Sequence, residues 1–345
     1  MEVTNAEHWD GKVMKKLINE PESFVDEMLE GLLAAHPAEL RRASTEERAL
    51  VRADAPVAGK VAIVTGGGSG HLPVFLGFVG FGLATGVAVG NVFSSPSSDA
   101  ILAATQACHG GAGVLYLYGN YTGDRLNFEL AAELAEAEGI ASATVLVNDD
   151  VASAPPDRSS ERRGVAGMVF AFKCAGAAAE RGDDLATVAE IARRTVAATR
   201  TMGVGLSAAV VPTVGKPTFV LADDEMEIGV GIHGEPGVRR GRLQSADAVA
   251  DELFDGVAAE LALGVGCQVA VLVNGLGATP VEELYILFRR IQHRLDEEGA
   301  VVHRAFVGEY ATSLEMAGAS VTILGLDEEL MALLDAPARS PFWRP

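Results

Sequence analysis

Cysteine is scarce in this chain of 345 residues. The three cysteines lie far apart, at Cys108, Cys174 and Cys267, and none belongs to a Cys-x-x-Cys pair. An odd and scattered set argues against a disulfide framework and against a structural zinc site, because both need closely spaced cysteines. The pattern is typical of a reducing compartment, so we expect a cytoplasmic protein.

Basic residues are also few. The chain has 27 Lys and Arg against 47 Asp and Glu, a formal net charge of −20, and no basic run is longer than two residues. A surface of this sign repels phosphate backbones and anionic lipid headgroups. We therefore expect no nucleic-acid partner and no membrane partner.

No stretch of the sequence has the pattern of a membrane-spanning helix. The segment 72–92 carries no charge, but it contains Pro73 and five glycines. Each glycine costs a helix roughly 1 kcal/mol relative to alanine, so we expect a buried helix, turn and strand there. The N-terminus also lacks the basic start and apolar stretch of a secretory signal.

Small and aliphatic residues dominate what is present. The chain has 39 glycines and only 6% aromatic residues, a composition typical of α/β proteins with closely packed helices. Its first half alternates strand and helix patterns, with strands expected at 60–65, 114–118 and 143–147 and a helix at about 125–138. Strand, helix, strand is the unit of a parallel sheet.

The pattern changes near residue 200. Segments 218–221 and 226–230 flank a polar turn and indicate a β-hairpin. Thr279 and Glu282 have the spacing of a capping box at the start of a further helix. The remaining expected elements are a strand at 269–273, the helix ending at about Glu298, and a strand at 301–307.

The sequence therefore predicts an α/β fold with two domains, 1–198 and 199–333. Each is expected to be a mostly parallel or mixed sheet covered by helices, with the C-terminal tail 334–345 packed back on the first domain.

A glycine-rich loop, 66–70, follows the first expected strand and precedes His71. It fits neither a dinucleotide fingerprint, a phosphate-binding P-loop nor a nucleophile elbow. Its backbone amides could approach a small polar ligand, or the loop could be only a tight turn. His71 would lie at the carboxyl end of the sheet, where open α/β folds bind ligands.

Asp124 follows the second expected strand, where a helix begins. It has two interpretations, a helix N-cap or a carboxylate near His71 that takes a proton from a substrate hydroxyl. His109 fits a helix end, and the tract 158–163 fits a solvated loop.

His233 lies in a glycine-punctuated segment, with no cysteine or second histidine at metal-ligand spacing. A lone imidazole in this setting is either a structural residue or a nucleophile. We expect no metal site in this chain.

Several motifs occur together and in order along the chain. These motifs are Arg52–Lys60, Gly66–His71, Asn120–Asp124, Arg162–Ala166, Gly231–Gly237 and Asn274–Pro280. Taken together, they resemble the substrate-binding subunit of dihydroxyacetone kinase, the DhaK family. The resemblance implies a kinase subunit that needs a partner for activity.

The resemblance also implies roles for individual residues. His233 is expected to form a hemiaminal with the carbonyl carbon of a short ketose such as dihydroxyacetone. Gly68, Ser69 and Gly70 are expected to line the substrate. His71 is expected to hydrogen-bond it and assist proton transfer, and Asp124 to activate the hydroxyl that receives the phosphoryl group.

The resemblance implies partners as well. A separate DhaL-like subunit would carry ATP, or ADP recharged by a phosphotransferase-system subunit, with its magnesium. No cofactor is expected on this chain itself, and a homodimer is expected.

Two positions depart from the pattern of enteric members of the family, which have lysine where Gly119 stands and glutamate where Leu72 stands. More space beside the substrate would admit a four-carbon ketose, so an erythrulose kinase subunit is one alternative. A non-catalytic, ketose-sensing regulatory paralogue is another. A serine hydrolase acting through Ser69 is a third, although the elbow spacing is wrong for it.

Overall fold

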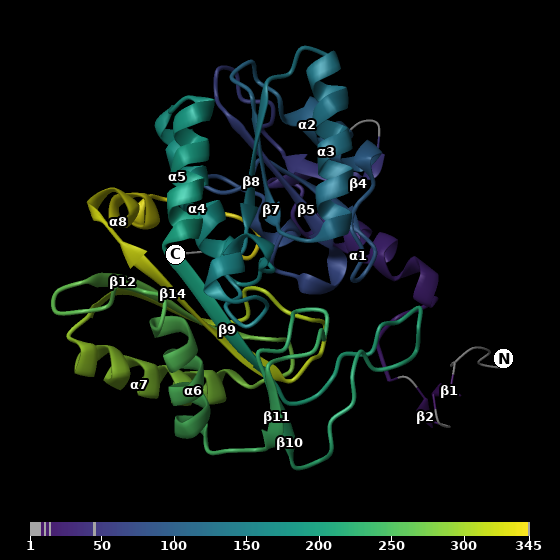
Figure 1. The fold of residues 1–345 in the computed structure, drawn as a ribbon. Helices are drawn as coiled ribbons and strands as arrows, with labels where there is room; N and C mark the ends of the chain where they lie inside the picture. The colour runs from purple at the N-terminus through teal and green to yellow at the C-terminus, as the bar shows by residue number, and fades with distance from the viewer. Residues whose placement is uncertain (1–7, 10–11, 14, 44–45, 344–345) are drawn as a thin grey trace.

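The computed structural model describes residues 8–9, 12–13, 15–43 and 46–343. Two six-stranded sheets lie beside one another with helices packed around them (Figure 1). A short pair of strands, β1 (His8–Trp9) and β2 (Lys12–Val13), lies apart from both sheets. The predicted α/β class is confirmed.

The first sheet has the order β3-β4-β6-β5-β7-β8. Four strands, β6, β5, β7 and β8, run parallel, and β4 and β3 extend them as an antiparallel edge. The strands are β3 (Leu40–Ala43), β4 (Glu46–Arg52), β5 (Ala62–Gly68), β6 (Gly86–Gly90), β7 (Val114–Gly119) and β8 (Ser142–Val147).

Helices cover both faces of this sheet, which is why its central strands are apolar throughout. One face packs on α2 (Ser98–Cys108) and α3 (Thr122–Ala137), and the other on α4 (Met168–Arg181) and α5 (Leu185–Ala197). Helix α1 (Phe24–Ala35) precedes the sheet. Short 3₁₀ turns occur at Pro21–Ser23, Ser69–His71, Leu76–Phe78 and Pro156–Glu161.

The second sheet has the order β11-β10-β9-β14-β12-β13. Only β12 and β13 pair in parallel; the other pairs are antiparallel. The strands are β9 (Thr199–Gly205), β10 (Glu225–Ile228), β11 (Arg239–Arg242), β12 (Gln268–Gly275), β13 (Val301–Gly308) and β14 (Gly318–Leu326). Helices α6 (Ala246–Ala258) and α7 (Val281–Glu298) cover its outer face.

The inner face of the second sheet packs against the first half of the chain. Ala270 and Leu272 of β12 belong to the same apolar cluster as Phe170 of α4. Helix α8 (Glu328–Asp335), which lies mostly within the expected second domain, packs on α4 (Figure 1). In the C-terminal tail, the backbone of Arg339 forms an isolated antiparallel β-bridge with Phe81 of the first half. The two sheets therefore share a core.

Two expectations about the second half are wrong. Segment 218–221 is not a strand, and β10 (Glu225–Ile228) instead pairs with β11 (Arg239–Arg242), which follows it in the chain. Thr279 does not cap α7, because its hydroxyl donates to the Gly318 carbonyl oxygen at 2.7 Å and accepts from the Gly318 amide at 2.8 Å.

Candidate active site

Close packing explains the glycines that end β5. A Cβ atom added at Gly67 would lie 2.2 Å from the Phe75 ring, and one at Gly68 would lie 2.4 Å from the Val92 carbonyl oxygen. No side chain fits at either position. The strand can therefore approach its neighbours closely, and the residues that follow it are held in place.

The amides after these glycines are already used within the protein. Ser69 donates to the Asn91 carbonyl oxygen at 3.3 Å and Gly70 donates to that of Val92 at 2.7 Å. Both amides are therefore engaged, which for these two residues favours the tight-turn interpretation over a direct contact with a ligand. What the loop presents is side chains, those of Ser69 and His71.

His71 is buried with one ring nitrogen engaged. Its Nδ1 lies 2.7 Å from the carbonyl oxygen of Thr312, which can only accept, so Nδ1 carries the proton. Burial, and then the neighbouring His233, lower the pKa of the His71 imidazole to about 3. The ring is neutral at physiological pH, and its Nε2 lone pair has no partner among the described residues.

His233 lies in the loop after β10 and faces His71. The centroids of the two rings are 4.7 Å apart and nearly perpendicular. Glu235 holds His233 twice, because its carboxylate accepts from Nδ1 and from the backbone amide, both at 2.9 Å. Nδ1 is thereby fixed as the donor, and the lone pair of His233 is on Nε2.

Glu235 is ionised in this arrangement. Burial alone would raise its pKa, but the hydrogen bond and charge of His233, together with the charge of Arg163, lower the pKa of Glu235 to about 2. A carboxylate beside Nδ1 stabilises positive charge on the imidazole, so His233 is supported as a nucleophile.

Asp124 lies in the first turn of α3 and is 8% exposed. It is not the N-cap, which is Tyr121. Burial raises the pKa of the Asp124 carboxyl to about 6, against opposing contributions from Ser95 and His233. Oδ1 has no hydrogen-bond partner among the described residues. A carboxylate with a pKa near the working pH is suited to proton transfer.

Unpartnered polar atoms gather around the histidine pair. Buried polar groups are normally hydrogen-bonded, yet the described residues offer none to Ser69 Oγ, His71 Nε2, Asp124 Oδ1, Thr218 Oγ1 and Ser313 Oγ. Segment 312–314 contacts the glycine loop directly, since the Leu314 amide donates to the Gly70 carbonyl oxygen at 2.8 Å. These groups are the complement of a small polyhydroxylated ligand.

The same atoms argue against a hydrolase. Ser69 Oγ and His71 Nε2 are both without partners, so the two side chains do not form a nucleophile–base hydrogen bond.

Aromatic rings close the other sides of the site. The Tyr121 and Phe93 rings lie 4.9 Å and 5.5 Å from the His233 ring, and Phe93 stacks on His71 at 5.0 Å. The Tyr121 hydroxyl donates to the Gly164 carbonyl oxygen at 3.0 Å, which fixes its ring. Such walls exclude water and strengthen the interactions of charges within them.

The tract 158–163 is not simply a solvated loop. Arg162 is 1% exposed and makes two hydrogen bonds of 2.7 Å to Glu260. Arg163 donates to Asp150 at 2.9 Å and lies 3.7 Å from Glu235. This second arginine connects the first half of the chain to the residue that holds His233.

The structure also shows the surroundings of Gly119 and Leu72, the two positions that depart from the enteric pattern. A Cβ atom at Gly119 would lie 3.0 Å from the Tyr121 ring, so the ring occupies the space beside it. Leu72 lines a cleft of about 440 Å³ together with Ser69 and Gly70. Additional space next to the glycine loop is therefore found on the Leu72 side.

His71 and His233 thus face each other, Ser69 lies in the same turn as His71, and His233 is near enough to Asp124 to oppose the burial that raises its pKa. Gly68 and Gly70 support the site through their close packing. Sequence reasoning missed the supporting residues Glu235, Arg163, Tyr121, Phe93 and Ser313. Three of them could have been found, since Arg163, Glu235 and Tyr121 lie inside the motifs Arg162–Ala166, Gly231–Gly237 and Asn120–Asp124.

The described residues contain neither a metal-binding cluster nor a membrane-spanning helix. No group of three or more His, Cys, Asp or Glu side chains has the arrangement of a metal site there. None of the helices described has the length and apolar composition required to cross a membrane.

Comparison with known proteins identifies the family. The Dak1 domain matches residues 30–342. A Listeria innocua protein, PTS-dependent dihydroxyacetone kinase 2, dihydroxyacetone-binding subunit DhaK, is 43% identical over 331 residues, which are 96% of this chain and 99% of that protein. The chain belongs to the DhaK family.

Other relatives include an erythrulose kinase, a dihydroxyacetone kinase and an operon co-activator. An L-erythrulose kinase of Pectobacterium atrosepticum is 44% identical over 96% of this chain, which spans 56% of that kinase. The crystal structure of the dihydroxyacetone kinase of C. freundii superposes with a TM-score of 0.83 at 35% identity, covering 95% of this chain and 60% of the other. The dihydroxyacetone kinase operon co-activator DhaQ superposes with a TM-score of 0.82 at 32% identity, covering 93% and 97%.

Proposed function

We propose that this protein is the substrate-binding subunit of a dihydroxyacetone-type kinase. It captures a short ketose covalently on His233 and presents a hydroxyl of that ketose for phosphorylation. The observation that carries the proposal is the His233 imidazole, which Glu235 fixes through Nδ1 and which faces the His71 ring, whose Nε2 has no partner among the described residues.

The covalent step follows from the protonation state of the two rings. The Nε2 lone pair of His233 forms a bond to the carbonyl carbon while the C=O π bond breaks. The oxygen takes a proton from solvent, and the imidazolium keeps its Nδ1 proton in the hydrogen bond to Glu235. His71 Nε2 then accepts a hydrogen bond from the new hydroxyl. An alcohol such as glycerol has no carbonyl and cannot form this adduct.

The transfer step uses Asp124. Its carboxylate accepts the proton of the substrate hydroxyl as that oxygen attacks the phosphoryl group of the donor. The raised pKa, about 6, makes Asp124 a stronger base than an exposed aspartate. The unpartnered Oδ1 supports this assignment, because it has an accepting site available.

The phosphoryl donor is assigned to a separate DhaL-like subunit that carries ATP or ADP with magnesium. The relative from Listeria innocua is named as a subunit of a PTS-dependent kinase, which supports a multi-subunit enzyme. A homodimer, drawn from the family resemblance, and a cytoplasmic location, drawn from the few scattered cysteines, form part of the same proposal.

Erythrulose is the second candidate substrate. Leu72, which stands where enteric members of the family have glutamate, lines a cleft together with Ser69 and Gly70 of the glycine loop. The erythrulose kinase relative supports this candidate.

A ketose-sensing role is the third candidate, because the co-activator DhaQ has the same fold. A sensor needs the His233 adduct but has no use for a proton acceptor. The buried Asp124 with its raised pKa favours catalysis over sensing.

Intact-mass spectrometry tests the proposal. The wild-type chain incubated with dihydroxyacetone, or with either enantiomer of erythrulose, should gain the mass of one ketose, and glycerol should add nothing. His233→Ala should abolish the increment, whereas Asp124→Asn and the exposed-histidine control His293→Ala should keep it. An increment that survives in His233→Ala would disprove the covalent role.

Phosphorylation then separates the candidates. With a DhaL-like subunit and a phosphoryl donor, the ketose that turns over faster identifies the substrate. A chain that captures ketose but supports no turnover would be a sensor.

A further inference from the structure

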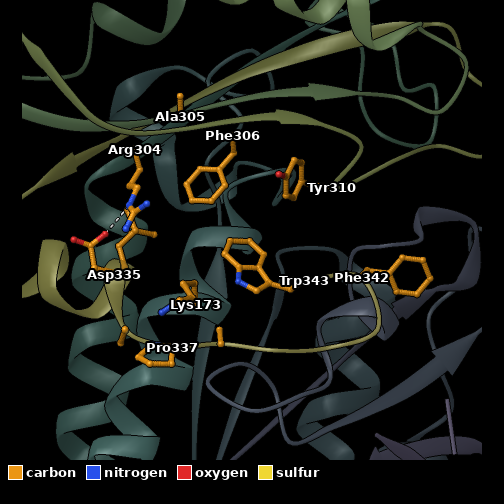
Figure 2. A pocket seen from close by; sticks show the side chains of 12 residues that line it. Lys173, Arg304, Ala305, Phe306, Tyr310, Asp335, Pro337, Phe342 and Trp343 are labelled. Atoms are coloured by element: carbon orange, nitrogen blue, oxygen red, sulfur yellow. Dashed lines mark hydrogen bonds and ion pairs between the residues drawn. The ribbon is translucent and has the colours of Figure 1, made fainter. Parts of the chain in front are cut away.

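A second cavity lies away from the histidine pair, where β13, α4, α8 and the C-terminal tail meet (Figure 2). Its volume is about 330 Å³, within the range of small-molecule sites. It shares no lining residue with the ketose site. The kinase function proposed above uses none of its side chains.

One wall of this cavity is aromatic. Phe306 and Tyr310 come from β13 and the segment after it, and Trp343 comes from the tail and faces them (Figure 2). The Trp343 centroid is 5.4 Å from that of Phe306 and 6.2 Å from that of Tyr310. Rings gathered in this way offer an apolar surface to a ligand.

Lys173 of α4 supplies a buried cation at the cavity. The residue is 1% exposed, and its Nζ donates to the Leu333 carbonyl oxygen of α8 at 2.6 Å. Among the described residues, no carboxylate lies within 4.0 Å of it. The Leu333 carbonyl oxygen, near the C-terminus of α8, engages only one of the three N–H donors of the Lys173 ammonium.

A buried ammonium without a counter-ion is costly. Burial lowers the pKa of the Lys173 amine to about 8, so the group is still mostly charged at pH 7. The nearby acid does not neutralise it, because Asp335 accepts from Arg304 at 2.7 Å and from His303 at 2.9 Å. The cavity therefore combines an apolar wall with donors that lack an anion.

We propose that this cavity binds a small organic anion, with its carboxylate on the Lys173 ammonium and its flat apolar body against Phe306 and Trp343. A carboxylate would supply the acceptors that the ammonium lacks. The aromatic wall selects against small inorganic anions, which have no apolar surface to bury.

A short segment of the chain links the cavity to the ketose site. Tyr310 lines the cavity, and the Tyr310 and Ala311 amides both donate to Asn274 Oδ1 at 2.8 Å. The next residue, Thr312, supplies the carbonyl oxygen that holds His71. A ligand that fixes Tyr310 acts on His71 through this short segment, so we infer that the anion alters ketose capture.

Tryptophan fluorescence tests binding without any ketose. The chain has two tryptophans, so a Trp9→Phe background leaves Trp343 as the reporter. Titration with 3-phenylpropanoate should change its emission saturably, and the neutral amide of the same acid should bind at least about tenfold more weakly. Equal affinity for the acid and the amide would overturn the proposal.

Two variants locate the site. Lys173→Met, in the same background, should weaken 3-phenylpropanoate binding about tenfold or more, and the exposed-lysine control Lys216→Met should not. Phe306→Leu keeps an apolar side chain but removes a ring, and should weaken both the acid and the amide. If Lys173→Met does not fold, as judged by circular dichroism, unchanged affinity in Phe306→Leu still refutes the site.

A further measurement addresses the coupling. Saturating 3-phenylpropanoate should shift the dihydroxyacetone concentration that gives half-maximal adduct on His233. An unshifted midpoint, with binding established by fluorescence, would disprove the coupling through Thr312. Because binding is measured without ketose, failure of this site and failure of the kinase function are distinguishable.

Discussion

The two sheets contribute to the ketose site in different ways. In the first sheet, Ser69 and His71 directly follow β5, and Asp124 lies in the helical turn after β7. In the second, His233 lies in an irregular loop beyond the end of β10. Regular secondary structure positions the residues of the first sheet, whereas charged side chains position His233.

This difference separates two kinds of support. The backbone of the first sheet is fixed by packing that leaves no room for a Cβ atom at Gly67 or Gly68. His233 depends on Glu235, which in turn lies 3.7 Å from Arg163 on the other half of the chain. Substituting a supporting charge should therefore disturb the nucleophile and leave the first-sheet residues in place.

The largest expected effect comes from the first sheet. Asp124→Asn keeps the size of the side chain but removes the proton acceptor, so kcat should fall about 10²–10⁴-fold. Steady-state kinetics with a DhaL-like subunit measures the loss. Ketose capture by intact mass serves as the control and should be preserved. Unchanged kcat would mean that another group is the base.

A smaller effect is expected in the second sheet. Glu235→Gln keeps an amide oxygen near Nδ1 but loses the negative charge that stabilises the imidazolium of the adduct. Ketose affinity should drop about 10–100-fold, the range for losing a charged hydrogen bond. Titration by intact mass gives the midpoint. A drop in kcat with an unaltered midpoint would contradict the positioning role.

The smallest effect is a pH dependence. Burial raises the pKa of Asp124 to about 6, and the base works only when ionised, so kcat should fall as the pH decreases through this value. One unit below it, about one tenth of the carboxyl is ionised, so the loss is about tenfold. A pH–rate profile that is flat between about 5 and 8 would exclude Asp124 as the base.

Stability should respond to the same group in the opposite sense. The folded chain holds the Asp124 proton more tightly than the unfolded chain, whose carboxyl has the ordinary pKa of 3.8. This contribution to the free energy of unfolding becomes more favourable as the pH falls from about 6 toward 3.8. Denaturation of wild type and Asp124→Asn across this range isolates the contribution, because other buried acids are common to both.

Local patterns predicted much of the first half. Apolar runs that end in polar or glycine-rich segments marked β5 and β7. They also marked the carboxyl ends of these strands, where His71 and Asp124 lie. In the second half, β11 was missed because its residues, Arg239–Arg242, are mostly basic and lie at a sheet edge. Edge strands carry charges that discourage further pairing, so they lack the apolar alternation of a strand.

Side-chain partners were the least predictable feature. Thr279 has the spacing of a capping residue, yet Gly318 of β14 provides partners for its hydroxyl. The sequence pattern predicts that Arg162 lies in a solvated loop, yet the residue is buried and pairs with Glu260. In both cases the partner is distant in sequence, and no local pattern reports it.

The sequence by itself determined the α/β class, the strand ends that carry Ser69, His71 and Asp124, and the motifs of the DhaK family. Tertiary structure decided that His233 meets His71, that Glu235 fixes its tautomer, and that Lys173 lies beside an aromatic wall. The physical reason is that periodicity reports which face of an element is buried, whereas contacts between elements depend on how the two sheets pack. Those contacts set the protonation state of each ring and carboxyl.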